Sequence, residues 1–325
     1  MDVTVIIPTR NRAELLLQTI KSIASQTIHQ DDYELIVVDN GSSDGTSEVV
    51  KSCMGKIRNM RYCRAENPGL HVARHRGLAE SSSALLIFGD DDIIAFPTWI
   101  DGVREAFRDP SVVMAGGNNM PKYESPPPPW VDRLWYETPW GRVLSYYSLI
   151  DFGDVVKEIP SDFVWGCNFS IRKPILREAG GFHPDSMPPS LQKYRGDGES
   201  HVSAFVKRNN FKTLFHPEAS VYHQVPRLRM NRRYLSERAF LQGMSDSYTD
   251  IREAGRVSAR MKVKGLFRVL NHFRYVGFPR FSEPSRSLLI GYYKGYYRHH
   301  KMVATDRELL RWVIRENYFA DDGRH

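Results

Sequence analysis

Three adjacent aspartates, Asp90, Asp91 and Asp92, are the residues of this sequence best suited to chemistry, because they follow an apolar run that ends at Phe88. Neighbouring carboxylates repel one another unless a cation or strong hydrogen-bond donors lie among them. The alternate pair Asp90 and Asp92 can face one ligand, and a hard divalent ion shared with substrate phosphates is the natural occupant. The triplet therefore predicts a Mg²⁺ or Mn²⁺ site. The alternative is an exposed acidic turn that caps the next helix.

Further polar residues follow the other apolar runs in the first part of the chain. Pro8, Thr9 and Arg10 come directly after the first run, and Asp39 ends the second. Arg74 lies in a later helical stretch. Guanidinium groups pair with phosphates, and a carboxylate can accept hydrogen bonds from a ribose or a base. These residues favour a nucleotide pocket, whereas a capped turn and solvated arginines are the alternative explanation.

The elements that must position these residues alternate between strand and helix over the first 115 residues. Strands are predicted over 3–7, 34–38, 60–63, 84–88 and 112–115, and helices over 13–25, from 46, over 70–80 and after 97. Such alternation is typical of a parallel sheet with helices on both faces. Ligands of these sheets bind beyond the carboxyl ends of the strands, where the polar residues lie.

The segment 116–160 breaks this pattern with a run of prolines and a group of aromatic residues: Trp130, Trp135, Tyr136 and Trp140. It is too long for an ordinary connection, so we expect a functional loop or lid. An aromatic mini-core under a long loop is the alternative. Regular patterns resume with an apolar stretch over 163–171, helices over 174–179 and 200–208, and short apolar runs at 213–215 and 220–222.

Composition narrows the classes of protein. The 325 residues, 41% of them hydrophobic, can bury one large core or two modest ones. Three cysteines are too few and too irregularly spaced for a disulfide framework, which favours a reducing compartment. The sequence opens with no signal-peptide pattern, and no segment reaches the roughly 20 apolar residues of a membrane span. We therefore expect a cytoplasmic protein, either free or peripheral at the inner face of the membrane.

The basic charge is concentrated in the last hundred residues. From Pro226 onward there are 21 Lys and Arg against 10 Asp and Glu, a net charge of +11, and since the whole chain carries +7, the first 225 residues carry −4. We expect a helix over 234–248 and a basic amphipathic segment over 257–281, followed by Tyr292, Tyr293, Tyr296 and Tyr297. The tail therefore predicts contact with an anionic membrane surface, or simple docking on the rest of the chain. Nucleic acid is a less favoured partner.

Taken together, six ordered stretches resemble the family 2 glycosyltransferases: VIIPTRNR, ELIVVDNGSSDGT, NPGLHVARHRGL, FGDDDI, WGCNFSIRK followed by GGF, and HPEASVYH. The resemblance implies an α/β fold of the nucleotide-sugar-binding GT-A type, a mostly parallel sheet flanked by helices, with a mainly helical C-terminal extension. The catalytic domain would be 1–225, with a nucleotide-binding half 1–115 and an acceptor-side half 116–225, and the basic, aromatic-rich extension 226–325.

The resemblance also implies an activity. It is the inverting transfer of a sugar from a nucleotide-diphosphate sugar to an acceptor hydroxyl, on a glycan or lipid-linked acceptor, in the synthesis of a surface polysaccharide or glycoconjugate. The implied donor contacts are Pro8, Thr9, Arg10, Asp39, Arg74, Asp90 and Asp91. Mg²⁺ or Mn²⁺ would be held by Asp92 and Asp90, with His223 as a further contact. A satisfied histidine at a strand end is the alternative for His223. Trp165, Gly166 and Asn168 would face the sugar or the acceptor, and a core position is the alternative for Trp165.

The general base of the family is an acid in a loop before a helix. Here the loop reads Arg195-Gly196-Asp197-Gly198-Glu199, and an ungapped count back from Phe211 places Glu199 at the position of the base. A glutamate can accept the hydroxyl proton with one more methylene of reach. A shift of one residue in the loop would make Asp197 the base instead.

Two other functions stay open at this stage. A nucleotidyltransferase would also bind a nucleotide on an α/β sheet, but the stretch PTRNRAE after the first strand lacks the glycine-rich phosphate loop expected there. A non-catalytic module that binds a sugar nucleotide or nucleic acid would suit the basic tail. It would leave the acidic triplet and the loop before 200–208 unexplained.

Overall fold

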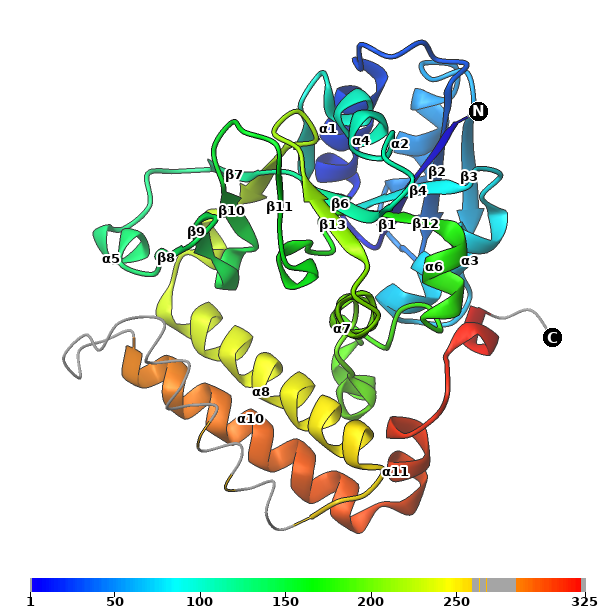
Figure 1. Ribbon diagram of the computed structural model, residues 1–325. Coiled ribbons are helices and arrows are strands. Elements are labelled where there is room, and N and C mark those ends of the chain that lie inside the picture. The colour runs from blue at the N-terminus through cyan, green and yellow to red at the C-terminus, as the bar shows by residue number, and fades with distance from the viewer. Residues whose placement is uncertain (1, 259–262, 264–266, 268–284, 323–325) are drawn as a thin grey trace.

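The structure of the chain, a computed structural model, describes residues 2–258, 263, 267 and 285–322. A layered α/β region, coloured blue to green in Figure 1, lies above a pair of long helices. The α/β region contains two sheets.

The main sheet has eight strands in the order β11-β13-β6-β12-β4-β1-β2-β3. The strands are β1 (Val3–Thr9), β2 (Tyr33–Asp39), β3 (Met60–Arg64), β4 (Leu85–Gly89), β6 (Val112–Gly116), β11 (Lys157–Glu158), β12 (Asn168–Arg172) and β13 (Lys212–Phe215). β1 pairs in parallel with β2 and β4, whereas β12 is antiparallel to β4 and β6. Every residue of β1 and β2 is buried, as expected where helices cover both faces. The predicted α/β sheet is confirmed.

Helices on the two faces of the main sheet form two separate cores. The helices are α1 (Ala13–Ala24), α2 (Thr46–Cys53), α3 (Leu70–Glu80), α4 (Trp99–Ala106), α6 (Lys173–Glu178) and α7 (Ser200–Arg208). Val5 and Ile7 of β1 belong to the core with α1, α2 and α4, while Ile6 belongs to the core with α3, α6 and α7. This alternation follows from the period of two along a strand. Gly77 of α3 has no room for a side chain, because a Cβ there would overlap Ile6.

The segment 116–160 is not an open loop or lid, so that expectation was wrong. It contributes most of a second sheet with the order β5-β14-β7-β10-β9-β8. The strands are β5 (Ile93–Ala95), β7 (Asn119–Tyr123), β8 (Tyr136–Thr138), β9 (Gly141–Leu144), β10 (Leu149–Asp151) and β14 (Val221–Val225). Trp130, in the short helix α5 (Pro129–Asp132), and Trp135, shortly after it, pack against a core that includes Leu144 and Leu149. The aromatic mini-core therefore exists, but it lies against a sheet.

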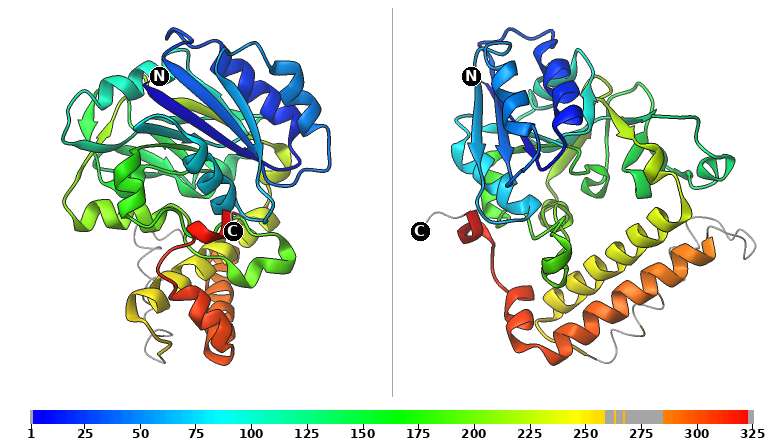
Figure 2. Two further views of the ribbon diagram at one scale, coloured as in Figure 1. Left: turned by 90° about the vertical axis from the view of Figure 1, so that its right-hand side faces the viewer. Right: turned by 180° about the vertical axis from the view of Figure 1, so that it is seen from behind.

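The C-terminal region is helical, as expected. Its helices are α8 (Arg232–Ala254), α10 (Ser285–Thr305) and α11 (Arg307–Val313). α8 and α10 run parallel, because Ser236 meets Ser287 near their starts and Ser247 meets His299 farther along. They approach closely at Gly295, where a Cβ would overlap a backbone oxygen of α8. Figure 2 shows this pair below the α/β region in both views.

The predicted amphipathic segment 257–281 lies almost entirely outside the described residues. Where the structure describes the chain, its helices are too short or too polar to traverse a bilayer.

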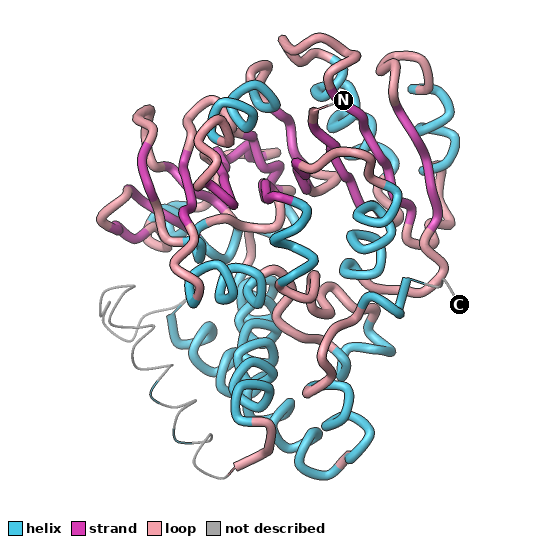
Figure 3. The backbone as a smooth tube through the Cα atoms, turned by 45° about the vertical axis from the view of Figure 1, so that its right-hand side comes forward, coloured by secondary structure: helices cyan, strands magenta, loops and turns pink. Residues whose placement is uncertain are grey.

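The last described residues return to the α/β region. The 3₁₀ turn η5 (Phe319–Asp322) lies against α3. Figure 3 shows the described chain ending beside the α/β region. His75 of α3 donates from Nδ1 to the Tyr318 carbonyl (3.2 Å), and its Nε2 accepts from the Phe182 amide (2.9 Å). Tyr318 in turn bonds the hydroxyl of Tyr248 in α8 at 2.7 Å. One residue thus joins α3 to the helical region.

Candidate active site

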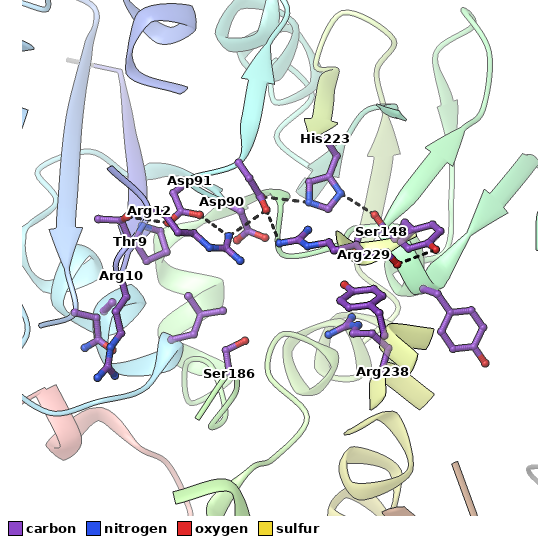
Figure 4. A pocket seen from close by; sticks show the side chains of 18 residues that line it. Thr9, Arg10, Arg12, Asp90, Asp91, Ser148, Ser186, His223, Arg229 and Arg238 are labelled. Atoms are coloured by element: carbon purple, nitrogen blue, oxygen red, sulfur yellow. Dashed lines mark hydrogen bonds and ion pairs between the residues drawn. The ribbon is translucent and has the colours of Figure 1, made fainter. Parts of the chain in front are cut away.

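The carboxyl ends of β1 and β4 open into a cleft with a volume of about 440 Å³, called here the main cleft. Pro8, Thr9 and Arg10 line it from the end of β1 (Figure 4). Asp39 ends β2 and is buried, accepting hydrogen bonds from the Ser42 amide and the Tyr62 hydroxyl, both at 2.7 Å. Its neighbour Asn40 lines the cleft instead.

All three aspartates of the triplet line the main cleft, and two of them accept hydrogen bonds from arginines. Arg12 Nη1 donates to Asp91 Oδ1 (2.8 Å) and to Asp92 Oδ2 (3.1 Å). Arg229, in the 3₁₀ turn η4 (Arg227–Arg229), donates to Asp92 Oδ2 at 2.8 Å. Burial raises the pKa of Asp91. Burial also opposes ionisation of Asp92, but its histidine and arginine neighbours outweigh that effect and lower its pKa. Asp92 is therefore the carboxylate that is most firmly ionised.

His223 of β14 faces Asp92 from the second sheet. Its Nδ1 lies 2.7 Å from the Tyr147 carbonyl, and a carbonyl can only accept, so Nδ1 carries a proton. Its Nε2 then points at Asp92 Oδ1, 3.2 Å away. Ligand atoms of Asp90, Asp92 and His223 all lie within 4.8 Å of one another.

A divalent cation fits this group of three residues. Asp92 Oδ1 is buried and makes no well-formed hydrogen bond among the described residues, and the His223 ring faces it as an ion-pair partner. The Tyr147 carbonyl holds the imidazole so that a ring nitrogen can point into the cleft. Two carboxylates and an imidazole are suitable ligands for Mn²⁺, while Mg²⁺ would rely on the carboxylates.

Arg74 is buried behind Asp90 and links it to the loop before α7, so it does not line the main cleft as we had expected. Its guanidinium lies 3.6 Å from Asp90 and 3.3 Å from Glu199, and it donates to the Gly166 carbonyl at 3.2 Å. Gly166 also donates from its amide to Glu199 Oε1 at 2.9 Å. A side chain at Gly166 would overlap the Arg74 guanidinium, so the packing requires glycine.

The two candidate bases lie in different surroundings. Glu199 is 23% exposed at its side chain and lines a second pocket beside the main cleft. Asp197 is 6% exposed: its Oδ1 pairs with His183 Nδ1 (2.7 Å) and its Oδ2 accepts from Thr249 Oγ1 of α8 (2.8 Å). Both carboxylate oxygens of Asp197 are thus bonded to residues outside the cleft. The expectation that Asp197 could be the alternative base was therefore wrong.

Asn168 does not face a ligand, which corrects a second expectation. It is 1% exposed, its Oδ1 accepts from Trp99 Nε1, and its Nδ2 donates to the Ala219 carbonyl, both at 2.9 Å. A fully bonded amide at the start of β12 stabilises the core rather than binding sugar hydroxyls. Trp165, by contrast, lines the second pocket.

The sequence reasoning did not single out Arg12, Arg229 or the Tyr147 carbonyl. Arg12 was visible as the second arginine after the first strand. Arg229 follows His223 by six residues. This spacing could have pointed to Arg229 only if β14 had been known to lie beside the triplet. Nothing in the sequence indicates which backbone carbonyl a histidine will meet.

Comparison with known proteins decides the family. The model of the family described as glycosyl transferase family 2 matches residues 4–180, more than half of the chain. The chain belongs to this family. Membership favours the glycosyltransferase expectation over the nucleotidyltransferase and the non-catalytic module.

Curated proteins similar in sequence agree with this assignment. Validoxylamine A glucosyltransferase from Streptomyces hygroscopicus subsp. jinggangensis is 32% identical over 200 residues, which cover 56% of this chain and 47% of that protein. Glucosyl-dolichyl phosphate glucuronosyltransferase from Haloferax volcanii is 24% identical over 263 residues, covering 77% of this chain and 78% of that protein. The match spans about half the length of the first of these curated relatives.

Solved structures confirm the GT-A fold expected for family 2. A mannosyltransferase from Pyrobaculum calidifontis, in complex with GDP-Man and Mn²⁺, aligns with a TM-score of 0.54 at 18% identity, covering 97% of this chain and 86% of that chain. S. aureus TarS 1–349 in complex with UDP-GlcNAc aligns with a TM-score of 0.51 at 12% identity, covering 94% and 92%. At these identities the likeness concerns the fold alone.

Proposed function

We propose that this chain is an inverting, metal-dependent glycosyltransferase that moves a sugar from a nucleotide-diphosphate sugar to an acceptor hydroxyl. The observation that carries the proposal is the bridge made by Arg74, which lies 3.6 Å from Asp90 and 3.3 Å from Glu199. It places a partly exposed carboxylate beside the group of residues suited to hold a metal ion. Two structural neighbours, solved in complex with GDP-Man and with UDP-GlcNAc, support a donor of this class.

The main cleft would bind the donor. Pro8, Thr9, Arg10 and Asn40 would contact the nucleoside side, at the carboxyl ends of β1 and β2. Asp90, Asp92 and His223 would hold Mn²⁺ or Mg²⁺, with Asp91 buried beside them. When bound, the ion supplies positive charge to the donor diphosphate and to the negative charge that develops as it leaves.

Two arginines beside the metal-binding group can also stabilise the negative charge of the donor diphosphate. Arg12 and Arg229 both contact Asp92 and can shift their donors to phosphate oxygens, because guanidinium groups match both geometries.

Glu199 would act as the base. As the acceptor hydroxyl attacks the anomeric carbon, its proton passes to a Glu199 oxygen, while the bond to the leaving diphosphate breaks on the opposite face of the sugar. One displacement of this kind inverts the anomeric configuration. Hydrogen bonds from Gly166 and Arg74 fix the carboxylate in place.

The acceptor would be a glycan or a lipid-linked saccharide, and the tail would provide any contact with an anionic membrane. Two of the four tyrosines expected at a membrane surface face α8 instead: Tyr296 is 1% exposed and donates to Asp250, while Tyr292 donates to Asp246. Tyr293 and Tyr297 are exposed, so a peripheral membrane contact would involve these two. Co-sedimentation of the chain with anionic liposomes, compared with a variant in which both are serine, tests this part.

A donor screen tests the activity. Nucleotide sugars with different bases are compared for the rise in Tm they give with Mn²⁺ present, because a ligand that binds only the native state stabilises it. The stabilising donor is then assayed for release of nucleoside diphosphate with saccharide acceptors. Glu199→Gln should keep the Tm shift and lose about 10²- to 10⁴-fold in kcat. Asp197→Asn, the matched change, should lose far less. An active Glu199→Gln variant would refute the assignment of the base.

A further inference from the structure

A second pocket with a volume of about 580 Å³ lies beside the main cleft. The two share Tyr146, Ser148 and Arg238 along their common edge, so they adjoin each other. Glu199 lines the second pocket and does not line the main cleft. A molecule in the second pocket would therefore meet the proposed base from the side away from the nucleotide.

The walls of the second pocket come from two parts of the chain. Phe163, Trp165 and Glu199 belong to the α/β region, whereas Gln242 and Asp246 belong to α8. Tyr292 of α10 completes the wall and donates a hydrogen bond to Asp246. Gln242 donates to the same carboxylate at 2.8 Å. The helical tail thus builds one side of this pocket.

The lining combines aromatic rings with hydrogen-bonding groups. Tyr136, Tyr146, Phe163 and Trp165 are all partly exposed, and the Trp165 indole is held by a bond from its Nε1 to the Asp162 carbonyl at 2.9 Å. Flat apolar rings suit the C–H faces of a pyranose. Amide, hydroxyl and carboxylate groups supply both donors and acceptors for sugar hydroxyls. This composition is that of a saccharide site.

The charges that line the second pocket restrict which saccharides it can bind. The described residues that line the pocket include three carboxylates, Asp162, Glu199 and Asp246, but one cation, Arg238. Arg238 lies at the edge shared with the main cleft, and Figure 4 shows it on the same side of that cleft as Arg229. Lys207 pairs with Asp162 (2.7 Å) and Arg74 with Glu199 (3.3 Å). Asp246 is bonded to the uncharged groups of Gln242 and Tyr292, so its charge is the one that chiefly disfavours a phosphate or carboxylate on a ring in this pocket. Arg238 borders both pockets, so it can also reach the diphosphate of the donor.

We propose that the second pocket binds the acceptor as an uncharged, hydroxyl-rich sugar ring, and that α8 and α10 of the tail form half of this site. The inference rests on the proposed function for the identity of the ligand as acceptor. It gives the tail a role in choosing the substrate, through Gln242, Asp246 and Tyr292.

The first experiment measures binding by the full chain, with Mn²⁺ present. Saturation-transfer NMR is recorded with a panel of neutral p-nitrophenyl glycosides and with glucose and glucose 6-phosphate. We expect at least one neutral glycoside to bind, and glucose to bind more tightly than glucose 6-phosphate. Absence of binding by every neutral probe, or tighter binding of the phosphate, would overturn the proposal.

Three variants on α8 separate a binding role from a structural one. Gln242→Ala should lower the affinity for the glycoside about five- to tenfold, the effect of one lost hydrogen bond. It should leave the rise in Tm caused by the donor unchanged. Asp246→Asn should reduce the discrimination against glucose 6-phosphate, which loss of packing alone would not do. Glu237→Gln is the control, because Glu237 pairs with Arg233 on the exposed side of the helix. Equal behaviour of Gln242→Ala and the control would overturn the proposal.

The proposed function can fail separately. If wild-type protein binds the glycoside through Gln242 but releases nucleoside diphosphate from no donor, the second pocket stands as a saccharide site and the transferase assignment falls. If donors are consumed while glycoside binding ignores Gln242 and Asp246, the transferase stands and the tail has no part in acceptor binding.

Discussion

Replacing Asp92 with asparagine should change both the stability of the protein and its response to metal. The carboxylate is 1% exposed and contacts Arg229 (2.8 Å), His223 (3.2 Å) and Arg12 (3.1 Å). Arg12 keeps its bond to Asp91 in the variant, whereas Arg229 and His223 lose a charged partner. A hydrogen bond to a charged group is worth about 1.5–3 kcal/mol, and two neighbouring losses are not additive. We expect the free energy of unfolding to fall by about 3 kcal/mol, or about 4 °C in Tm for a chain of this length.

The metal response is the more specific part of this prediction. A cation at a hundred times its Kd stabilises the native state by about 2.7 kcal/mol. An amide supplies no charge to hold the ion, so Asp92→Asn should lose most of the rise in Tm that Mn²⁺ gives to the wild-type protein.

Differential scanning calorimetry at several Mn²⁺ concentrations measures both effects. Asp91→Asn is the matched control, because Asp91 is also buried and bonded to Arg12 and to Thr9 but is not one of the three grouped ligand atoms. It should lower Tm in the absence of metal and keep the Mn²⁺ response. An unchanged Mn²⁺ response in Asp92→Asn, or its loss in Asp91→Asn alone, would refute the assignment of the metal site.

Three further predictions concern the wider fold. Burial lowers the pKa of His201 to about 4 and of His299 to about 3, so the unfolded chain binds more protons than the folded one below about pH 6.5. The free energy of unfolding should therefore be highest above that pH and fall by about 2 kcal/mol per histidine at pH 5. Urea unfolding at pH 7 and at pH 5 measures this difference. A constant stability would contradict this. Thr249→Val removes the bond from α8 to the loop of the proposed base and should lower kcat about three- to tenfold with donor affinity unchanged. Gly295→Ala should destabilise the protein by about 2 kcal/mol because its Cβ overlaps α8, whereas Gly45→Ala, in open space, should change stability by less than about 0.5 kcal/mol in the same unfolding assay.

The sequence predicted the nucleotide-binding half of the fold because its signals are strong and local. β1 and β4 are continuous apolar runs, and parallel strands bring Thr9 and Asp90 to the same edge. The second sheet was missed because its strands have three to five residues, too few for a period of two to stand out from a proline-rich background.

Side-chain direction was the part of the site that sequence could not supply. Asn168 and Trp165 lie three residues apart, yet one is bonded inside the core and the other lines a pocket, a difference set by the turn between them. The helical period places Tyr292 and Tyr296 together and Tyr293 and Tyr297 together, but only the position of α8 decides which pair is covered. Arg229 reaches Asp92 from the turn after β14, a contact between residues 137 positions apart that no local pattern predicts.

The contact of Tyr318 with α3 has a consequence for synthesis on the ribosome. A nascent chain can pair β1, β2 and β4 as soon as the first hundred residues have left the exit tunnel, since early-emerging regions fold first. The carbonyl that accepts from His75 Nδ1 belongs to Tyr318, so this hydrogen bond can form only after more than two hundred further residues have been synthesised. During that interval the part of α3 that η5 later covers is open to chaperones, and the loop carrying Glu199 lacks the support of α8. Completion of the active site therefore follows the synthesis of α8 rather than the folding of the sheet.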